Sequence, residues 1–327
     1  MGEYARSLTL AQAVQRRWPA AEIHFMLSRA APYAALCPFP ATLLDASPTF
    51  HTPEIVRQIA DWRPRVVLFD NAGRSAQLRA ARRAGAALVF ISARARQRRR
   101  AFRLRWMRLL DEHWIAYPAF LAGALTFLER LKLSVAGRPQ VRYLDVVAPL
   151  GDTIGRGRAP DGDFLLLVPG GGTGHPDAQD AIGRFIAAAG ALARAGHRVL
   201  LVGVPEPGEP GVQGLSPVPQ AELIGLLRAA QVVVSNGGST LLQSLACGAA
   251  TVAVPIAGDQ GTRVRGCAAA GVALAAALDA ADMARAAATL ATDAAARSAL
   301  QGRARALNLA DGVALALAAL ARFAPDA

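Results

Sequence analysis

Two glycine-rich segments in the second half of the chain have the residue types that bind phosphate. Each follows an apolar run typical of a buried strand and precedes a helical pattern. Glycines let backbone N–H groups approach a ligand closely, and the positive N-terminal end of a helix attracts an anion. Two such turns at the ends of parallel strands predict a diphosphate bound at the carboxyl edge of one sheet. The candidate residues are Gly170, Gly171, Gly172 and Thr173 in the first segment and Asn236, Gly237, Gly238, Ser239 and Thr240 in the second.

The second glycine segment lies inside one complete unit of a parallel α/β fold, residues 232–255. Three valines at 232–234 indicate a strand, and a helical pattern starts at Ser239 or Thr240, whose hydroxyls suit the cap of the helix. Residues 251–255 return to a strand. A strand, a loop, a helix and a second strand in this order build a parallel sheet.

Strands and helices alternate along the whole chain. The apolar patterns predict strands at residues 21–27, 41–45, 65–70, 86–92, 113–117, 141–147, 164–168, 199–204, 232–234 and 251–255. They predict helices at residues 5–17, 52–62, 77–85, 177–195, 220–229 and 282–323. Residues 151–162 contain Gly, Pro and charged residues without a period, which indicates a linker. The fold class is therefore α/β, with two Rossmann-like parallel-sheet domains at residues 1–150 and 151–327, and a C-terminal helix that folds back over both halves.

The first domain begins with a helix where an α/β domain normally begins with a strand. Residues 5–17 form a clear amphipathic pattern directly after Gly2, Glu3 and Tyr4. Either the true start lies upstream of Met1, or the sheet lacks its usual first strand. We expect the former, because a domain that starts with this helix leaves a central position in its sheet open.

The positive charge of the chain is confined to its first half. Residues 1–150 contain 23 Lys and Arg against 10 Asp and Glu, whereas residues 151–327 contain 13 against 14. Residues 94–110, which begin with Arg94 and end with Leu110, place eight arginines among apolar residues that include Phe102 and Trp106. This segment predicts either attachment to an anionic membrane surface or a basic helix that packs its apolar face on the sheet. Nucleic acid is not expected as a partner, because no nucleic-acid-binding motif accompanies the charge.

Other composition signals exclude several classes. The three cysteines show no paired spacing and the five histidines are scattered, so no disulfide framework, no metal site and no cofactor are expected. No apolar run reaches the roughly 20 residues that cross a bilayer, and no secretion leader is evident. We therefore expect a cytoplasmic protein, peripheral on the inner face of the cytoplasmic membrane if residues 94–110 bind lipid. The Ala-, Arg- and Gly-rich composition is typical of a GC-rich bacterial source.

The second half resembles the nucleotide-sugar glycosyltransferases of the GT-B architecture, and most closely the MurG-like family. That family has a small-residue loop, a helix with an acidic residue, a glycine, a strand that ends in proline, and an Asp-Gln or Gln-Gln pair. This chain has residues 235–240, Gln243, Gly248, Pro255, and Asp259 with Gln260 in the same order and spacing. Roughly 40 contiguous residues match. The resemblance implies two Rossmann-like domains that face a cleft, with the nucleotide-sugar held by the second domain and the acceptor by the first.

The first helix is similar to the corresponding segment of PseG-type UDP-sugar hydrolases, a related branch. Residues 2–11 match its pattern of glycine, histidine, arginine and leucines, with Glu3 at the position of the histidine. Two further departures lie in the second half, where Gln243 replaces the donor-side glutamate and Arg263-Val264 replaces an Asn-Ala pair. A glutamate can still act as a base, and a glutamine can still bond to ribose hydroxyls.

The resemblance implies an inverting, metal-independent glycosyltransferase that uses a UDP-sugar and a lipid-linked or membrane-proximal acceptor. The two glycine segments would bind the diphosphate, Gln243 the ribose, and Asp259 and Gln260 the sugar hydroxyls. Glu3 would be the general base that deprotonates the acceptor. Two alternatives remain open, a nucleotide-sugar hydrolase in which water replaces the acceptor, and an inactive GT-B protein that binds a nucleotide.

Overall fold

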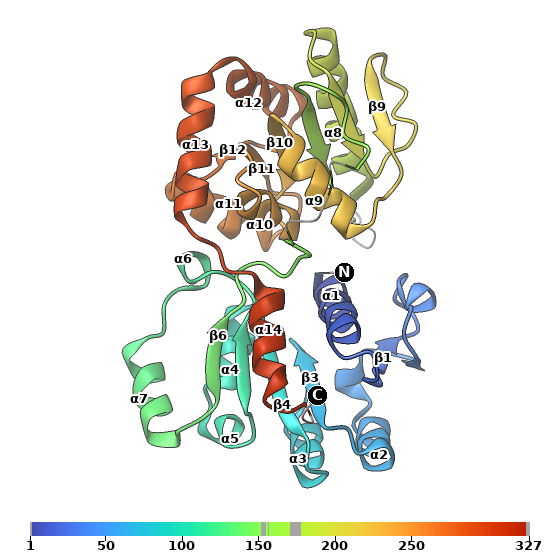
Figure 1. Ribbon diagram of the computed structural model, residues 1–327, viewed down its shortest axis with the longest axis vertical. Coiled ribbons are helices and arrows are strands. Elements are labelled where there is room, and N and C mark those ends of the chain that lie inside the picture. The colour runs from blue at the N-terminus through green and yellow to red at the C-terminus, as the bar shows by residue number, and fades with distance from the viewer. Residues whose placement is uncertain (1, 152–154, 156, 171–177, 325–327) are drawn as a thin grey trace. The chain divides into compact units, whose positions relative to one another are not determined.

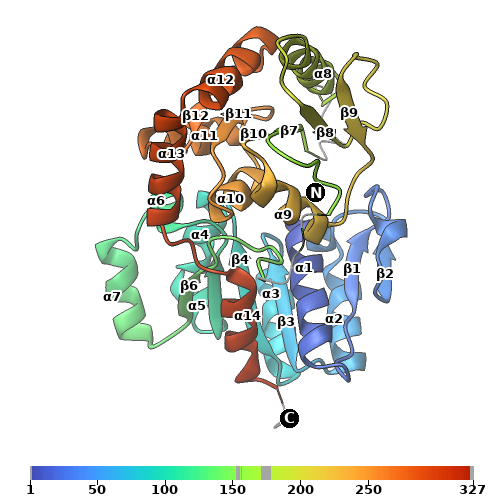
Figure 2. The same cartoon turned by 45° about the horizontal axis from the view of Figure 1, so that its top comes forward.

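The computed structural model describes residues 2–151, 155, 157–170 and 178–324, and these residues divide into two compact units. The C-terminal unit contains residues 148–309, and the N-terminal unit contains residues 3–147 together with the chain from Ala310 onward. Figures 1 and 2 show both units as sheets covered by helices. Each unit is described by itself.

The C-terminal unit is built on one parallel sheet of six strands. Its strands are β7 (Leu165–Val168), β8 (Val199–Val202), β9 (Val212–Leu215), β10 (Val232–Asn236), β11 (Thr251–Val254) and β12 (Leu274–Ala275), in the spatial order β12-β11-β10-β7-β8-β9. Its helices are α8 (Ala178–Arg194), α9 (Gln220–Ala229), α10 (Ser239–Ala246), α11 (Gln260–Ala269), α12 (Ala280–Thr292) and α13 (Ala294–Ala306). From β7 the chain builds outward to β9, then returns to β10 on the other side of β7. The strand order therefore reverses between β7 and β10.

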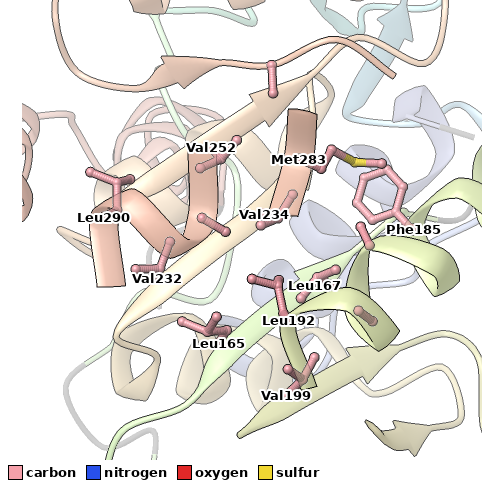
Figure 3. Close-up of a cluster of buried hydrophobic side chains, with 14 of the residues drawn as sticks. Leu165, Leu167, Phe185, Leu192, Val199, Val232, Val234, Val252, Met283 and Leu290 are labelled. Carbon is pink, nitrogen blue, oxygen red and sulfur yellow. The ribbon is translucent and has the colours of Figure 1, made fainter. Parts of the chain in front are cut away.

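The core of the C-terminal unit explains why β7, β10 and β11 read as continuous apolar runs. These strands are buried along their whole length, as expected for a parallel sheet with helices on both faces. Figure 3 shows one side of this core, where Leu167 and Val234 lie near Phe185 of α8 and Met283 of α12. This packing fixes the ends of β7 and β10, from which the candidate site is built.

The N-terminal unit contains two parallel sheets. One has the order β3 (Val66–Asp70), β4 (Ala87–Ser92), β5 (Glu112–Ile115) and β6 (Gln140–Tyr143), and the other pairs β1 (Phe25–Ser28) with β2 (Ala41–Leu44). The α-helices are α1 (Gly2–Arg17), α2 (Thr52–Trp62), α3 (Ser75–Arg83), α4 (Ala95–Ala101), α5 (Leu104–Met107), α6 (Ala119–Ala122), α7 (Phe127–Ala136) and α14 (Gly312–Ala321). Two short 3₁₀ helices lie at Ala34–Leu36 and Pro48–Phe50.

The two sheets of the N-terminal unit share one core. Leu44 of β2 belongs to the same apolar cluster as Phe69 of β3 and Phe90 of β4. Among the described residues, no strand pairs with the free edge of β1 or with the free edge of β3. Accordingly β3 is mostly half-buried, whereas all six residues of β4 are buried. The open position that the sequence predicts in this sheet is present in the structure.

Helix α14 covers the sheet of the N-terminal unit, although it comes last in the chain. Ala316 and Ala319 pack with Leu10 of α1 and Trp114 of β5. Two polar contacts also hold the segment, since the backbone N–H of Ala310 donates to Asp145 at 2.9 Å and Arg322 pairs with the buried Glu112.

The basic segment at residues 94–110 differs from the single amphipathic helix expected for a membrane-surface element. It forms two short helices, α4 and α5, and its large apolar residues Phe102, Trp106 and Leu110 are at most 3% exposed. Trp106 packs edge-on against Phe90 of β4 at a centroid distance of 5.2 Å. The structure therefore contradicts insertion of these side chains into a bilayer and confirms the alternative, in which the apolar face packs on the sheet.

No helix within the described residues is both long and apolar enough to span a bilayer.

Candidate phosphate-binding site

The candidate site lies at the carboxyl edge of the C-terminal sheet, where the strand order reverses. Ser235 of β10 is in register with Val168, the last residue of β7, and Asn236 is in register with Val254, the last residue of β11. Three strand ends therefore meet at one edge. In open α/β sheets, ligands bind at such a switch point, outside the carboxyl ends of the strands.

The side chain of Asn236 joins the two glycine segments. It is 7% exposed, and its amide nitrogen donates to the backbone carbonyl of Pro169 at 2.8 Å. Its amide oxygen accepts from the backbone N–H of Gly238 at 2.7 Å. Both polar atoms of this buried side chain are thus satisfied, as a buried amide requires. The contact fixes the end of β7 against the turn that follows β10.

Two of the predicted glycines are required by this contact. Gly170 has a φ of +84°, and a β-carbon added there would lie 1.8 Å from the amide nitrogen of Asn236. A β-carbon on Gly238 would lie 2.6 Å from the amide oxygen of the same residue. Any other residue at either position therefore displaces Asn236.

A Gly-Gly turn suggests a left-handed backbone, but Gly237 is required because of a close neighbour instead. Its φ lies outside the left-handed region, but an added β-carbon would lie 2.6 Å from a methyl group of Val264. Its N–H donates both to the carbonyl of Val254 at 2.8 Å and to the side-chain oxygen of Gln260 at 3.1 Å. The close approach of α11 therefore excludes a side chain here.

The side chain of Gln260 forms hydrogen bonds to the protein backbone. Its side-chain oxygen accepts from the N–H groups of Gly237 and of Ile256, the latter at 3.0 Å. This residue therefore ties the turn after β10 to the loop after β11. The neighbouring Asp259 precedes α11 with its side chain 58% exposed, and it pairs with Arg263 at 3.2 Å.

Arg263 is the residue at this site that the sequence does not reveal. Its side chain is only 10% exposed, and its Nε donates to the carbonyl of Gly237 at 2.6 Å. The guanidinium thus places a positive charge next to the predicted phosphate-binding turn. In the sequence it is visible only as one half of the Arg-Val pair that replaces an Asn-Ala pair, and no pattern connects it with Gly237.

Helix α10 begins at Ser239, with Gly238 as its N-cap. The expected hydroxyl cap from Ser239 or Thr240 is wrong, because both residues lie inside the first turn and no described side chain caps this end. Ser239 is exposed, whereas Thr240 and Gln243 are 7% and 4% exposed. The backbone N–H groups of the first turn and the helix dipole therefore remain available to an anion.

Three of the residues predicted for the first glycine segment, Gly171, Gly172 and Thr173, lie outside the described residues.

Glu3 lies in the N-terminal unit, at the carboxyl edge of β3. Its carboxylate accepts from the side-chain nitrogen of Asn71 at 3.1 Å and lies 3.6 Å from Arg94. Asn71 follows β3 with a φ of +53°, and its oxygen accepts from the N–H of Ala93 after β4 at 2.8 Å. One turn further along α1, Arg6 makes a bidentate contact with the buried Asp70 at 2.9 and 2.5 Å.

These contacts set the protonation of Glu3. Burial alone raises its pKa, but hydrogen bonds from its own backbone N–H and from Asn71, with the charge of Arg6, more than offset this. The pKa of Glu3 therefore lies below its ordinary value. Glu3 is charged at neutral pH, so it can accept a proton, but it is a weaker base than an ordinary glutamate.

Other reactive side chains do not form a second site in the part of the chain that the structure describes. Burial raises the pKa of Cys247 and of Cys267 to about 11, so both are protonated at neutral pH, as expected for small core residues. No group of three or more His, Cys, Asp or Glu side chains is placed to hold a metal ion among these residues.

Comparisons with protein-family models and with curated proteins find no match to this sequence. The structure is nevertheless similar to solved structures over nearly its whole length. MurG from Acinetobacter baumannii has a TM-score of 0.65 at 16% identity, covering 98% of this chain and 96% of that chain. The spinosyn rhamnosyltransferase SpnG complexed with thymidine diphosphate has a TM-score of 0.63 at 17% identity, and the match covers 98% of this chain and 97% of that chain. A Phytolacca americana protein complexed with UDP-2-fluoroglucose and pterostilbene has a TM-score of 0.65 at 14% identity, and the match covers 98% of this chain and 96% of that chain. The chain therefore has the GT-B fold, as its sequence predicts.

Proposed function

We propose that this protein is a glycosyltransferase that moves a sugar from a UDP-sugar to a hydroxyl group of a lipid-linked or membrane-proximal acceptor. The observation that carries the proposal is the set of contacts at the switch point of the C-terminal sheet. There Asn236 joins the two glycine segments, and Arg263 supplies a positive charge beside the uncapped start of α10. Such a turn has the shape and charge to bind the diphosphate of a nucleotide-sugar.

The same groups would assist the chemical step. In an inverting transfer, the acceptor oxygen attacks C1 of the sugar from the face opposite the diphosphate. The bond between C1 and the phosphate oxygen breaks, and the nucleoside diphosphate leaves with the electron pair. Arg263 and the first turn of α10 would stabilise the negative charge on this leaving group, which is why we propose that no metal ion is required.

Glu3 would take the proton of the acceptor hydroxyl in this scheme. It is charged at neutral pH, which is the form that a base must have. Gln243 would contact the ribose, and Asp259 and the side-chain nitrogen of Gln260 would contact sugar hydroxyls. The side-chain oxygen of Gln260 is already engaged by Gly237 and Ile256, so Gln260 would donate rather than accept.

One observation favours a second candidate, a GT-B protein that binds a nucleotide without transferring a sugar. The pKa of Glu3 is lowered by its hydrogen bonds and by Arg6, which weakens it as a base. The hydrolase alternative differs from the transferase only in the acceptor, which is water.

An assay of UDP release from a panel of UDP-sugars distinguishes these candidates. We expect release that depends on an added bacterial lipid extract and persists in a metal chelator. Release at the same rate without any extract would show a hydrolase. Binding of UDP without release from any donor in the panel would show a nucleotide-binding protein.

A further inference from the structure

A cavity of about 180 Å³ lies at the amino edge of the four-stranded sheet in the N-terminal unit. Glu112 and Gln140, the first residues of β5 and β6, are in register at this edge. Helix α14 runs along the sheet and brings the end of the chain to the same place (Figure 2). Glu3 lies at the opposite, carboxyl edge of the sheet. We call this space the amino-edge cavity, and its lining residues are Asp111, Gly137, Arg138, Gln140, Arg322 and Phe323.

Asp111, on one wall of the cavity, has more hydrogen-bond donors than it needs. Its carboxylate pairs with Arg82 at 3.0 Å and with Arg138 at 3.2 Å, and it accepts from the backbone N–H of Leu88 at 2.8 Å. One arginine and one backbone N–H already satisfy a half-buried carboxylate. The charge of Arg138, whose side chain is 42% exposed, is therefore in excess at this wall.

Glu112 has the same surplus of donors. It is fully buried and accepts from the indole nitrogen of Trp114 at 2.9 Å and from Arg142 at 3.1 Å, and it also pairs with Arg322. The side chain of Arg322 is 40% exposed, whereas the carboxylate that it contacts is inaccessible to solvent. Arg142 and Trp114 hold Glu112 from within the unit, so the charge of Arg322 is available to the cavity.

The cavity is therefore positively charged. Four arginines and two carboxylates meet around it, which leaves two positive charges. The C-terminal ends of α7 and α14 also lie here, and their partial negative charges, about half an elementary charge each, leave the sum positive. A concave surface of one sign concentrates the field and attracts an ion of the opposite sign.

Hydrogen-bond donors on the cavity wall are also unused. Among the described residues, no acceptor bonds to Nη1 of Arg322 or to Nε of Arg138. The side-chain oxygen of Gln140 accepts from Arg142 at 2.9 Å, which leaves its amide nitrogen to donate. The ring of Phe323 lies 5.2 Å from the guanidinium carbon of Arg322 and holds that group in a cation–π contact. Three donor side chains from two elements of the fold thus line one small space.

We propose that the amino-edge cavity binds phosphate, either as the inorganic ion or as the phosphate group of a small ester. A phosphate group has three strong acceptor oxygens that point in different directions, whereas the two oxygens of a carboxylate lie in one plane. Donors from Arg138, Gln140 and Arg322 match the phosphate, and guanidinium groups suit it in geometry. This proposal does not depend on the proposed transferase function, because the cavity lies in the other unit from the candidate phosphate-binding turn.

The volume of the cavity limits the ligand. A water molecule takes about 30 Å³ in the liquid, so the cavity has room for about six waters. Pockets that enclose drug-sized molecules measure roughly 300–1,000 Å³. A nucleotide is therefore too large, whereas phosphate with a short carbon chain fits, and Phe323 supplies an apolar wall for that chain.

Calorimetric titration of the full-length protein with inorganic phosphate, glycerol phosphate and succinate tests this proposal. The ionic strength is held constant, because a chain of net charge +12 attracts every anion. We expect both phosphate compounds to bind and succinate, a dicarboxylate, to bind much more weakly. Tighter binding of glycerol phosphate would assign the cavity to an ester, and equal binding would assign it to the inorganic ion. Succinate that binds as tightly as phosphate would contradict the proposal.

Arg138→Gln and Arg322→Gln should each weaken phosphate binding at least about tenfold, because each removes a charge-assisted hydrogen bond. Arg138→Gln is the safer variant for folding, since Asp111 keeps Arg82 and the N–H of Leu88. Circular dichroism verifies that both variants fold. Arg57→Gln is the matched control, because it removes the same charge from an exposed position on α2 of the same unit.

Arg263→Gln is the second control, since phosphate could also bind at the turn of Gly237 in the other unit. Binding at the amino-edge cavity should be unchanged in Arg57→Gln and retained in Arg263→Gln. The proposal is wrong if phosphate does not bind, if Arg138→Gln binds it like the wild type, or if Arg57→Gln loses as much affinity. It is also wrong if only Arg263→Gln loses binding. Absence of UDP binding, which would contradict the proposed function, changes none of these outcomes.

Discussion

The amide nitrogen of Asn236 lies 1.8 Å from the position that a β-carbon on Gly170 would occupy. The two residues are 66 positions apart in the chain, yet each restricts the type of residue that can occupy the other position. Asn236 needs the space beside Gly170 to reach the carbonyl of Pro169, and Gly170 can carry no side chain while Asn236 is there. Asn236 is the last residue of β10 and Gly170 lies two residues after the end of β7, so this contact builds the candidate phosphate-binding turn.

Gly170→Ala should therefore destabilise the protein beyond the effect of backbone strain. A positive φ costs an alanine about 1 kcal/mol, and loss of the buried Asn236 hydrogen bond adds roughly 1–3 kcal/mol. Gly203→Ala is the control, because Gly203 follows β8 with a φ of +92° and its β-carbon would meet no atom within 4 Å. Chemical denaturation of both variants should show the larger loss for Gly170→Ala. Equal losses would mean that the contact with Asn236 contributes nothing.

Arg263→Gln should weaken UDP binding by about 10- to 100-fold, because a charge-assisted hydrogen bond contributes about 1.5–3 kcal/mol. Arg265→Gln, an exposed arginine on the same helix, removes the same charge and should leave the affinity nearly unchanged. Calorimetric titration of each variant with UDP measures the difference. If the two variants bind alike, Arg263 has only a structural role toward Gly237 and Asp259.

Glu3→Gln should abolish turnover and leave UDP affinity unchanged, because it removes the proton acceptor but keeps the side-chain volume. The pH profile provides a second test. Since the pKa of Glu3 lies below its ordinary value, kcat/KM should be flat through neutral pH and fall only below the usual range for a glutamate. A variant with full activity, or an acid limb near neutral pH, would assign the base to another residue.

His113 should make the protein less stable in weak acid. It is fully buried on β5, and burial, reinforced by the charge of Arg98, lowers its pKa to about 3. Because its unfolded pKa is about 6.5, the unfolded state binds a proton below that pH while the folded state does not. The free energy of unfolding should then fall by about 2 kcal/mol between pH 7 and pH 5 from this residue alone.

His113→Gln removes the titrating group, so it should lose much less stability over the same pH interval, whatever its stability at pH 7. Urea denaturation at both pH values measures this difference. The same pH dependence in the variant and the wild type would show that His113 is protonated without cost in the folded state.

The alternation of strands and helices was predictable because buried parallel strands are continuous apolar runs, and each predicted strand is present in the structure. The short strands β9 and β12 were missed, and the single helix predicted at residues 282–323 is wrong, because the structure divides it into α12, α13 and α14. The glycines at 170, 237 and 238 were also predictable as places of close backbone approach. The contacts that require Gly170 and Gly237 were not, because Asn236 reaches Gly170 from another strand and Val264 reaches Gly237 from α11. The partnership of Arg263 with Gly237 likewise depends on how α11 packs beside β10.

The basic segment and α7 show a second limit. Arginines interleaved with Phe102 and Trp106 fit a membrane surface and a buried helix equally well, and only the packing against Phe90 decides between them. The sequence of α7 gives no such signal either, since Phe127 and Val135 could face a core or solvent. Exposure of apolar residues is a property of the assembled fold.

The most direct test of the account is calorimetric titration of the full-length protein with UDP. We predict one binding site per chain, an affinity that is insensitive to a metal chelator, and a strong loss of binding in Gly237→Val, where the added side chain meets Val264 and displaces the turn. Absence of binding to UDP, TDP, GDP and CDP alike would contradict the assignment of a nucleotide site to the turn of Asn236, Gly237 and Gly238.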